Sequence, residues 1–497
     1  MERATDAVSL LTMTRQPVRF VPDVHRVITK PFLAEQHGSA DEGSRAEPII
    51  RRILAMPATE VSVTLSGIQA DFADRHADFT GVLERSFALV ARHIENVEDL
   101  SEDRRLLIGS YFTHEYAIEG AALSNPSIVS APDQSGLRQG EQRFVMSLRA
   151  IGEGHISSIE FRTGLIDPSG GITVDSPSHF PVIGDRRSPT YDKEHFAAKL
   201  EELGAMDDIA RACLDALPPH FTLDRLEDAL GGIERQGIDH SVWAHTTKVI
   251  HWLASSNYNT LFPTDSEISD RVIFPAGPTE SHGMEDARFV RFVHENGRVI
   301  YYATYTAYDG SQILPQLIET SDFASFRIST LGGSAARNKG IALFPRKIDG
   351  EYAALSRQDN ENNYLMLSSN IRFWDHTERI QIPSRPWELT QIGNCGSPLE
   401  TEAGWLVITH GVGPMRQYTL GAVLLDAEDP ARIIGHLDEP LLTADADERD
   451  GYVPNVVYSC GSMIHGGLLV VPYGFSDRGA GVATVPVTDL LNRLTRE

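Results

Sequence analysis

The sequence has little that would point to disulfide bonds, a structural metal or a membrane. Its 497 residues include only three cysteines, Cys213, Cys395 and Cys460, which are widely spaced and form no CxxC pair. This pattern excludes a disulfide framework and a cysteine-based zinc site, and it predicts packed, reduced thiols in a reducing compartment. The chain has no run of 18 or more apolar residues, so we expect no transmembrane helix.

Positive charge is also scarce. The chain has 44 lysines and arginines against 69 aspartates and glutamates, and its formal net charge is -25. This balance argues against nucleic acid and against an anionic membrane surface, because both require a basic face. The N-terminus has no continuous apolar stretch of the signal-peptide kind, so the expected location is cytoplasmic. If such a protein binds a small anion, it must use a few local basic residues.

Composition changes along the chain and suggests separate regions. We expect a partly irregular N-terminal segment over 1–45, which includes a polar linker, and a helical region over 46–120. A strand-rich domain is predicted over 121–490, interrupted by a helical insertion at about 190–258. The two helical regions are predicted from apolar residues at helical spacing, as in "FTGVLERSFALVARHIENVEDL" and "DKEHFAAKLEELGAMDDIARACLDAL".

The strand-rich part repeats one plan, in which a turn glycine is followed by an apolar strand, a polar break and a second strand. Gly297, Gly350, Gly404 and Gly467 mark four such units, 53, 54 and 63 residues apart, and a partial fifth lies around Gly140. A period of this length in a strand-rich chain is typical of a β-propeller with one sheet per blade. The sequence therefore predicts a mainly β fold with a five-bladed β-propeller; the alternative is a β-sandwich with coincidental spacing.

Polar residues recur near the strands of these units. Glu285 and Asp286 form a carboxylate pair two positions before Arg288 in "SHGMEDARFV". The other units carry Asn125, Arg149, Lys339, His410, Tyr418 and Asp477. A charge beside a packed strand is costly unless it lines a solvated pocket. In a propeller such residues can meet around one ligand although they are far apart in sequence.

Several motifs resemble one known family. "GMEDARF", "NKGIALFPRKIDGEY", "GSPLETEAGWLVITHGV" and "GYVPNVVYSCG" occur in the order found in glycoside hydrolase family 130, which contains β-mannoside phosphorylases and β-mannosidases. The resemblance covers roughly residues 120–165 and 260–490. It implies a five-bladed propeller, which agrees with the count of repeated units. The helical region before 120 and the insertion fall outside it.

The resemblance also implies roles for individual residues. The Glu-Asp-Pro-Arg motif of the family matches residues 285–288, with Ala287 in place of proline, and it implies that Asp286 is the general acid. The implied phosphate ligands are Arg149, Lys339, His410 and Tyr418. The implied contacts to the mannoside are Asn125, Glu285, Arg288 and Asp477. No metal and no cofactor is expected; inorganic phosphate is the co-substrate.

The residue types agree with phosphorolysis. Inverting hydrolysis requires an acid and a carboxylate base. Phosphorolysis requires only the acid, because phosphate is already an anionic nucleophile and is held by cations. To be protonated near neutral pH, Asp286 would need a raised pKa, which burial could supply.

The sequence therefore favours an inverting β-mannoside phosphorylase that releases α-mannose 1-phosphate from a β-mannoside or manno-oligosaccharide. Glu388 and Glu400 lie near the predicted pocket mouth, so an inverting β-mannosidase on the same fold is the alternative. A non-catalytic sugar-binding propeller is a third alternative. The sequence leaves three alternatives for the helical regions: covering the site, limiting the length of the acceptor, or forming contacts in a homo-oligomer.

Each candidate also has a structural alternative. Arg149 can pair with Glu153 on the surface, Lys339 can be a solvated strand entry, and His410 can be a core histidine. For the tryptophans, core packing is the default expectation over sugar stacking.

Overall fold

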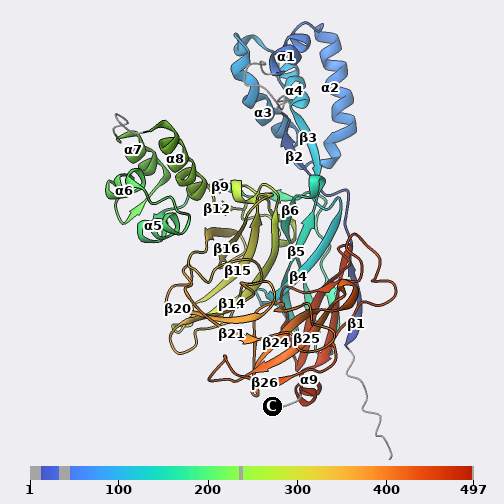
Figure 1. Cartoon of the computed structure of the whole chain (residues 1–497). Coiled ribbons are helices and arrows are strands. Elements are labelled where there is room, and N and C mark those ends of the chain that lie inside the picture. Colours follow the sequence, from blue (N-terminus) through green and yellow to red (C-terminus); the bar gives the residue numbers. More distant parts are fainter. Residues whose placement is uncertain (1–12, 33–44, 234–238, 495–497) are drawn as a thin grey trace, which may run out of the picture. The chain divides into compact units, whose positions relative to one another are not determined.

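The computed structural model describes residues 13–32, 45–233 and 239–494 (Figure 1). The chain forms two compact units. The larger unit comprises Met1–Pro22, Ala121–Pro177 and Ile183–Glu497, and the smaller comprises Asp23–Gly120 and Ser178–Val182. No helix in the described ranges is both long and apolar enough to cross a membrane.

The larger unit is mainly β and contains five sheets of four or more strands. In the first sheet, the order is β4 (Ala122–Ser130), β5 (Gln142–Ile151), β6 (Ser157–Ile166), β13 (Arg271–Ile273) and β8 (Val182–Ile183), with β7 (Ile172–Val174) beside β6. In the second, it is β14 (Met284–Val293), β15 (Val299–Tyr308), β16 (Ile313–Thr320), β17 (Ser325–Thr330), β12 (Tyr258–Leu261) and β9 (Asp185–Arg187).

The remaining three sheets follow in chain order. The third runs β18 (Ala342–Leu343), β19 (Tyr352–Ser356), β20 (Asn363–Ser368) and β21 (His376–Gln381). The fourth runs β22 (Gln391–Asn394), β24 (Gly404–Val412), β25 (Tyr418–Leu425) and β26 (Ile433–His436), with β23 (Leu399–Thr401) beside β24. The fifth runs β27 (Val457–Tyr458), β29 (Leu468–Phe475), β30 (Gly479–Pro486) and β1 (Thr14–Phe20), with β28 (Met463–His465) beside β29.

The repeated turn glycines occupy corresponding places in the five sheets. Gly140, Gly297, Gly350, Gly404 and Gly467 precede or begin β5, β15, β19, β24 and β29, respectively. All five have positive φ, between 79° and 132°. Glycine adopts this conformation without the steric cost that a Cβ would bring. The repeat read from the sequence therefore corresponds to one sheet per unit, and the expectation of a mainly β fold is confirmed.

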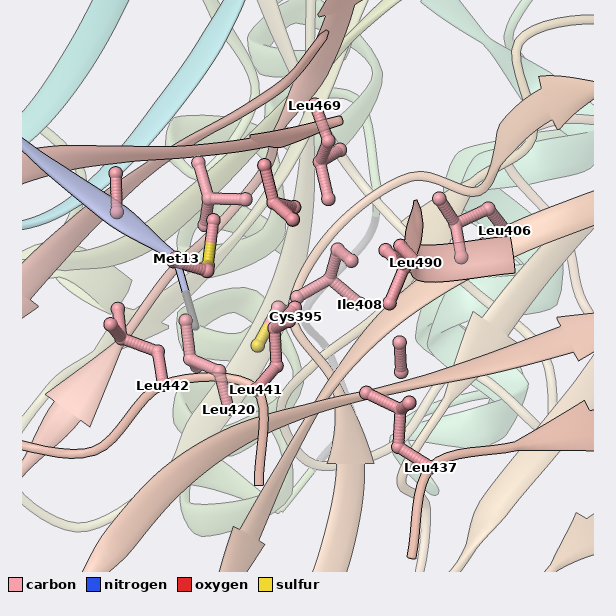
Figure 2. Close-up of a cluster of buried hydrophobic side chains, with 14 of the residues drawn as sticks. Met13, Cys395, Leu406, Ile408, Leu420, Leu437, Leu441, Leu442, Leu469 and Leu490 are labelled. Carbon is pink, nitrogen blue, oxygen red and sulfur yellow. The ribbon is translucent and has the colours of Figure 1, made fainter. Parts of the chain in front are cut away.

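Apolar side chains between the fourth and fifth sheets form a large core cluster (Figure 2). Leu406 and Ile408 of β24 and Leu420 of β25 lie in it with Leu469 of β29, and each is at most 3 % exposed. Leu490 of α9 (Val487–Arg493) belongs to the same cluster. Removing such side chains from water is the main favourable term that holds one sheet against the next. Trp374 and Trp405 are fully buried, as the core-packing expectation requires.

The helical insertion has its own core. It contains α5 (Lys193–Glu202), α6 (Asp208–Asp215), α7 (Leu223–Gly231) and α8 (His240–Ser255), together with the short pair β10 (Tyr191–Asp192) and β11 (His220–Phe221). Aspartate side chains at 192, 207 and 239 accept hydrogen bonds from the first free backbone amides of α5, α6 and α8. The apolar faces of these helices meet around Leu200, Leu226 and Ile250.

The smaller unit consists of α1 (Ala46–Leu54), α2 (Ala58–Phe72), α3 (Phe79–Val90) and α4 (Glu102–Tyr111), with the strand pair β2 (Val27–Pro31) and β3 (Thr113–Ala117). Its helices pack around a cluster that includes Ile50, Phe87 and Leu107. Arg26 and Glu119 form an ion pair of 2.9 Å with both side chains buried.

Strands β1 and β2 fall in the segment 1–45 that the sequence analysis expects to be partly irregular. Residues 1–12 and 33–44 of that segment lie outside the described residues. β1 forms because its backbone pairs with β30, from Thr14 opposite Thr484 to Phe20 opposite Ala480. A distant partner of this kind leaves no local signal in a short, mostly polar strand.

A buried carboxylate fastens β1 to the fifth sheet. Glu448 is 1 % exposed and accepts hydrogen bonds from Arg15 of β1 at 2.9 Å and from the Tyr473 hydroxyl of β29 at 2.7 Å. Arg19 adds a contact of 3.2 Å. Burial alone would raise the pKa of Glu448, but the hydrogen bonds from Arg15 and Tyr473 outweigh it and hold the pKa below the ordinary 4.5.

We predict that Glu448→Gln lowers the free energy of unfolding by about 3 kcal/mol, because it removes the buried charge that Arg15 and Arg19 share and leaves Arg15 only the exposed Asp445 as a counter-ion. Since the folded-state pKa of Glu448 is depressed, its contribution is complete above about pH 4.5 and is lost as the pH falls. The difference between wild type and variant, measured by urea unfolding, should therefore shrink below pH 4.5. The control Glu400→Gln, which breaks an exposed pair with Arg346, should cost under about 1 kcal/mol; equal losses would contradict the prediction.

Candidate active site

Two β-bulges bring Asp286 and Asn125 together. The register of β14 against β15 shifts between Glu285 and Arg288, and that of β4 against β5 shifts between Ser124 and Ser127. Asp286 and Asn125 lie in these bulges with φ of 57° and 50°, a conformation that Asp and Asn tolerate better than most residues. The Asn125 amide donates a 2.6 Å hydrogen bond to Asp286 Oδ1. The bulge in β14 forms with Ala287 in the position of the family's proline.

Glu285 bridges two of the predicted phosphate ligands. Its Oε1 accepts from Arg149 at 2.8 Å and its Oε2 from Lys339 at 2.5 Å. Arg149, from β5, also lies 3.8 Å from Asp286 Oδ1. The ion pair of Arg149 is thus made with the predicted site and not with a surface residue. One carboxylate satisfies two cations that the sequence assigned to phosphate.

Arg288 is held rigidly under the site. Its side chain is 1 % exposed, and its guanidinium donates to the Asp286 carbonyl at 2.8 Å and to the Tyr458 hydroxyl at 2.7 Å. Burial opposes its charge, but the surrounding Tyr458, Cys460 and Asp286 raise the pKa of Arg288, so it remains a fixed cation. Tyr458, on β27, was not singled out from the sequence, although it lies in the quoted motif "GYVPNVVYSCG".

The ionisation of Asp286 differs from the expectation. Burial alone would raise its pKa, but the charges of Arg288 and Arg149 and the hydrogen bond from Asn125 hold the pKa of Asp286 below its usual range. Burial, which the sequence analysis names as a source of a raised pKa, is therefore outweighed at Asp286. The reason is electrostatic, since the cations around this carboxylate outweigh its desolvation.

Asp477 is the carboxylate whose pKa is raised. It lies in the turn between β29 and β30 with φ of 46°. Burial is the main cause of the raised pKa, and the nearby charge of Asp286 adds to it while Arg149 opposes it. The pKa values of Asp286 and Asp477 are thus moved in opposite directions, because cations surround the first while burial dominates at the second.

His410 and Tyr418 belong to the fourth sheet. The His410 ring is buried, stacks on Tyr418 with ring centroids 6.0 Å apart, and meets Tyr458 edge-on at 4.8 Å. Burial, with Arg357 and Arg288 nearby, lowers the pKa of His410 well below its ordinary value. His410 is therefore a neutral group that can donate or accept a hydrogen bond, and its Nε2 has no partner among the described residues.

Sequence reasoning missed Arg357. It follows β19, is 7 % exposed, and its Nε has no hydrogen-bond partner in the described part of the chain. A Cβ on Gly393 would lie 2.1 Å from Arg357 and 2.5 Å from the His410 ring, so both side chains converge over this glycine. The side chain of Asn394, next in β22, is buried with both polar atoms unpaired within the same ranges. The arginine in "LSRQDN" looks like a solvated turn residue in the sequence, which is why its role was not apparent.

Two carboxylates kept for hydrolysis have local structural partners. Glu388 is buried and accepts from the Ser384 amide at 3.1 Å and from Arg385 at 3.3 Å. Glu400 is exposed and pairs with Arg346 at 2.7 Å. Both carboxylates are engaged by neighbours other than the Asp286 cluster, so the expectation that they lie at its mouth gains no support.

Comparison with known proteins identifies the family of the chain. The model of glycoside hydrolase family 130, described as beta-1,4-mannooligosaccharide phosphorylase, matches residues 257–496. A beta-1,2-mannobiose phosphorylase of Thermoanaerobacter sp. (strain X514) is 33% identical over 221 residues, which cover 42% of this chain and 68% of that protein. A 1,2-beta-oligomannan phosphorylase of the same strain is 37% identical over 155 residues, covering 31% of this chain and 52% of that protein.

A solved beta-1,2-mannobiose phosphorylase from Listeria innocua superposes on 76% of this chain and 93% of its own, with 19% identity and a TM-score of 0.45. The chain spans about half to two thirds of the length of the curated relatives it matches. On the sequence match to the family and to its characterised members, the chain belongs to glycoside hydrolase family 130.

Proposed function

We propose that this protein is an inverting β-mannoside phosphorylase. A phosphate oxygen attacks the anomeric carbon of a β-linked mannosyl unit, the bond to the leaving oxygen breaks, and Asp286 supplies the proton that the leaving oxygen takes up. The products are α-mannose 1-phosphate and a shortened acceptor. The names of the sequence relatives support this activity, since both relatives described above are phosphorylases of β-linked mannosides.

One observation carries the proposal: Arg149 and Lys339 meet at a single carboxylate directly beside Asp286. Glu285 holds the two cations in a position where they can bind an oxyanion. A phosphate dianion would take the place of the Glu285 carboxylate between them, and it carries more negative charge. Arg149 would bind it as a planar fork and Lys339 as a point charge. Neutral His410 and the Tyr418 hydroxyl would add hydrogen bonds, and Arg357 is the further cation we assign to this cradle.

Phosphate would also convert Asp286 into an acid. Without phosphate, the nearby cations keep its pKa low. A bound dianion neutralises these cations, so the pKa of Asp286 rises and the carboxyl takes up a proton. The acid is then available only when the nucleophile is present. Asn125, Arg288 and Asp477 would orient Asp286 and the mannosyl unit.

We further propose that the five sheets are the blades of a five-bladed propeller. The assigned residues support this arrangement because each sheet or its preceding loop contributes one: Asn125, Asp286, Lys339, His410 and Asp477. A propeller brings such positions to one central site. A cytoplasmic location, which the three free and buried cysteines support, and homo-oligomer formation through the helical regions remain predictions from the sequence.

An inverting β-mannosidase is the second candidate. The observation in its favour is Glu285, a second carboxylate 2.8 Å from the guanidinium that also faces Asp286. Once free of its cations, this group could activate water. Its engagement with Arg149 and Lys339 disfavours that role, and a sugar-binding propeller without activity would not need the cluster.

The test is product analysis on β-1,2-mannobiose and β-1,4-mannobiose with and without orthophosphate. We expect mannose 1-phosphate only with phosphate, and a loss of at least about 100-fold in kcat for Asp286→Asn. Phosphate should raise the Tm of Glu285→Gln by more than it raises the Tm of wild type, because in the variant the anion no longer competes with a carboxylate for the two cations. Mannose released at equal rates in phosphate-free buffer would establish the hydrolase instead.

The pH dependence provides a separate prediction. The general acid must be protonated, so the rate falls as the pH rises through the pKa of Asp286. Because phosphate raises that pKa, the basic limb of kcat/KM for the mannoside should move to higher pH as phosphate goes from far below to far above its KM. Chloride at matched ionic strength is the control. A limb that stays in place would contradict the proposed coupling.

Glu280 fixes the turn that leads into Asp286. Its buried carboxylate accepts from the amides of Ala276 at 2.9 Å and Gly277 at 3.0 Å, and from the hydroxyls of Tyr258 and Tyr305. Its carbonyl accepts from the Gly283 amide at 2.7 Å. The turn therefore has little freedom just before the bulge in β14, and Glu280 is a positioning residue.

We predict that Glu280→Gln lowers kcat by about 10- to 100-fold, because small displacements of an acid are costly, while KM for phosphate stays within about twofold. The Tm of the variant, measured alongside, must lie above the assay temperature so that unfolding does not account for the loss. Tyr308→Phe, which removes an exposed hydroxyl bonded to Gly310, is the matched control. Parallel losses of kcat and phosphate affinity would show that Glu280 does not act by positioning.

A further inference from the structure

A cavity of about 410 Å³ lies away from the proposed active site, between the helical insertion and the outer part of the second and third sheets. Its lining comes from the segment 189–199, which includes the start of α5, from Leu253 and Asn257, from β17 and from residues 368–373, and it includes none of the groups assigned to catalysis. β17 is the fourth strand of a sheet whose first strand carries Asp286. Three strand spacings place the cavity on the order of 14 Å from that strand.

The insertion wall of this cavity is anchored to the sheets. Lys199 of α5 donates to the Leu331 carbonyl at 2.9 Å, and Glu202 accepts from the Gly333 amide at 3.0 Å. His195 lies with Nε2 2.9 Å from the Thr330 carbonyl. The cavity is therefore a built feature of the larger unit. Its volume is that of a small-ligand site.

Several polar groups facing the cavity have no partner in the protein. Thr190, Glu194, Arg327 and Ser369 line the cavity and are exposed. Within the described ranges their side chains form no hydrogen bond or ion pair, and the charge of Arg327 is balanced only at longer range by Glu319 and Asp192. Arg372, by contrast, is held by Ser329 at 3.3 Å and by an ion pair with Glu319. The free groups comprise a donor cation, an acceptor carboxylate and two hydroxyls. They can bind a ligand rich in hydroxyl groups without rearranging the fold.

The charges around the cavity nearly cancel. Three cations, Lys199, Arg327 and Arg372, stand against four carboxylates, Asp192, Glu194, Glu202 and Glu319. Such a balance disfavours a phosphate or another multivalent anion. The half-buried ring of Phe373, which packs against Gly332, provides an apolar face. Carboxylate, guanidinium and hydroxyl groups around one aromatic ring suit a neutral sugar, whose rings have both a polar edge and an apolar face.

We propose that this cavity is a second binding site, for a neutral oligosaccharide, formed by the helical insertion and the outer strands of two sheets. The choice of a mannoside as its ligand rests on the proposed function. The site would hold part of a longer β-mannan chain on the enzyme without taking part in bond cleavage. It also gives the insertion, which lies outside the family match, a role in substrate retention.

The test uses the full chain in phosphate-free buffer, so that the oligosaccharide is not phosphorolysed while its binding is measured. Calorimetric titration with β-1,2-mannotetraose and with β-1,4-mannotetraose should give two binding events per chain for at least one of them. Ser369→Trp, which fills the cavity, and Arg327→Ala, which removes its free cation, should each abolish one event or weaken it at least tenfold. Arg298→Ala, which changes an exposed arginine in the turn before β15, is the control and should retain both events.

The outcomes separate this inference from the proposed function. Phosphorolysis of mannobiose by the Ser369→Trp and Arg327→Ala variants should stay within twofold of wild type. One binding event for both tetraoses in the wild type, or two undiminished events in Ser369→Trp, would overturn the second site even if phosphorolysis is found. If the wild type shows two binding events, Ser369→Trp shows one, and the enzyme does not phosphorolyse mannosides, the second site is upheld and the proposed reaction is refuted.

Discussion

The balance of charge around Arg149 is the constraint on which the candidate site depends. Its guanidinium lies between Glu285 and Asp286, which are neighbours in sequence but are both directed toward it by the bulge in β14. Lys339 closes the cluster from the loop before the third sheet. In a partly buried setting such charges must compensate one another. The positions of several sheets relative to each other are therefore tied to the same few ion pairs.

Several buried polar groups near this cluster lack a hydrogen-bond partner. Arg288, Arg357 and His410 each keep a buried polar atom without a partner in the described part of the protein, and Asn394 keeps two. Buried polar groups in folded proteins are normally satisfied, so a concentration of exceptions indicates a place for water or a ligand. The ion pairs hold the cluster together, and its unpaired polar atoms can bind a ligand. These are the two properties that an anion-dependent reaction requires.

Local patterns predicted more of this protein than charge did. The turn glycines gave the number of sheets because a positive φ is a local demand, and the motif around Asp286 was recognisable because its residues are contiguous. The lowered pKa of Asp286, the convergence of Arg357 on His410 and the pairing of β1 with β30 depend on residues that are tens to hundreds of positions apart. A single sequence holds no record of such distances, so they could not be inferred from it.

The pairing of β1 with β30 also constrains the order of assembly. Thr14 meets Thr484, so the fifth sheet cannot acquire its last strand until almost the whole chain has left the ribosome. At typical rates of synthesis that delay is roughly 20–90 seconds. During this time β1 has no sheet to join, and an unpaired strand of this kind invites association with other chains. The last step of folding is therefore the step most exposed to aggregation, and chaperones that shield nascent strands would act on it.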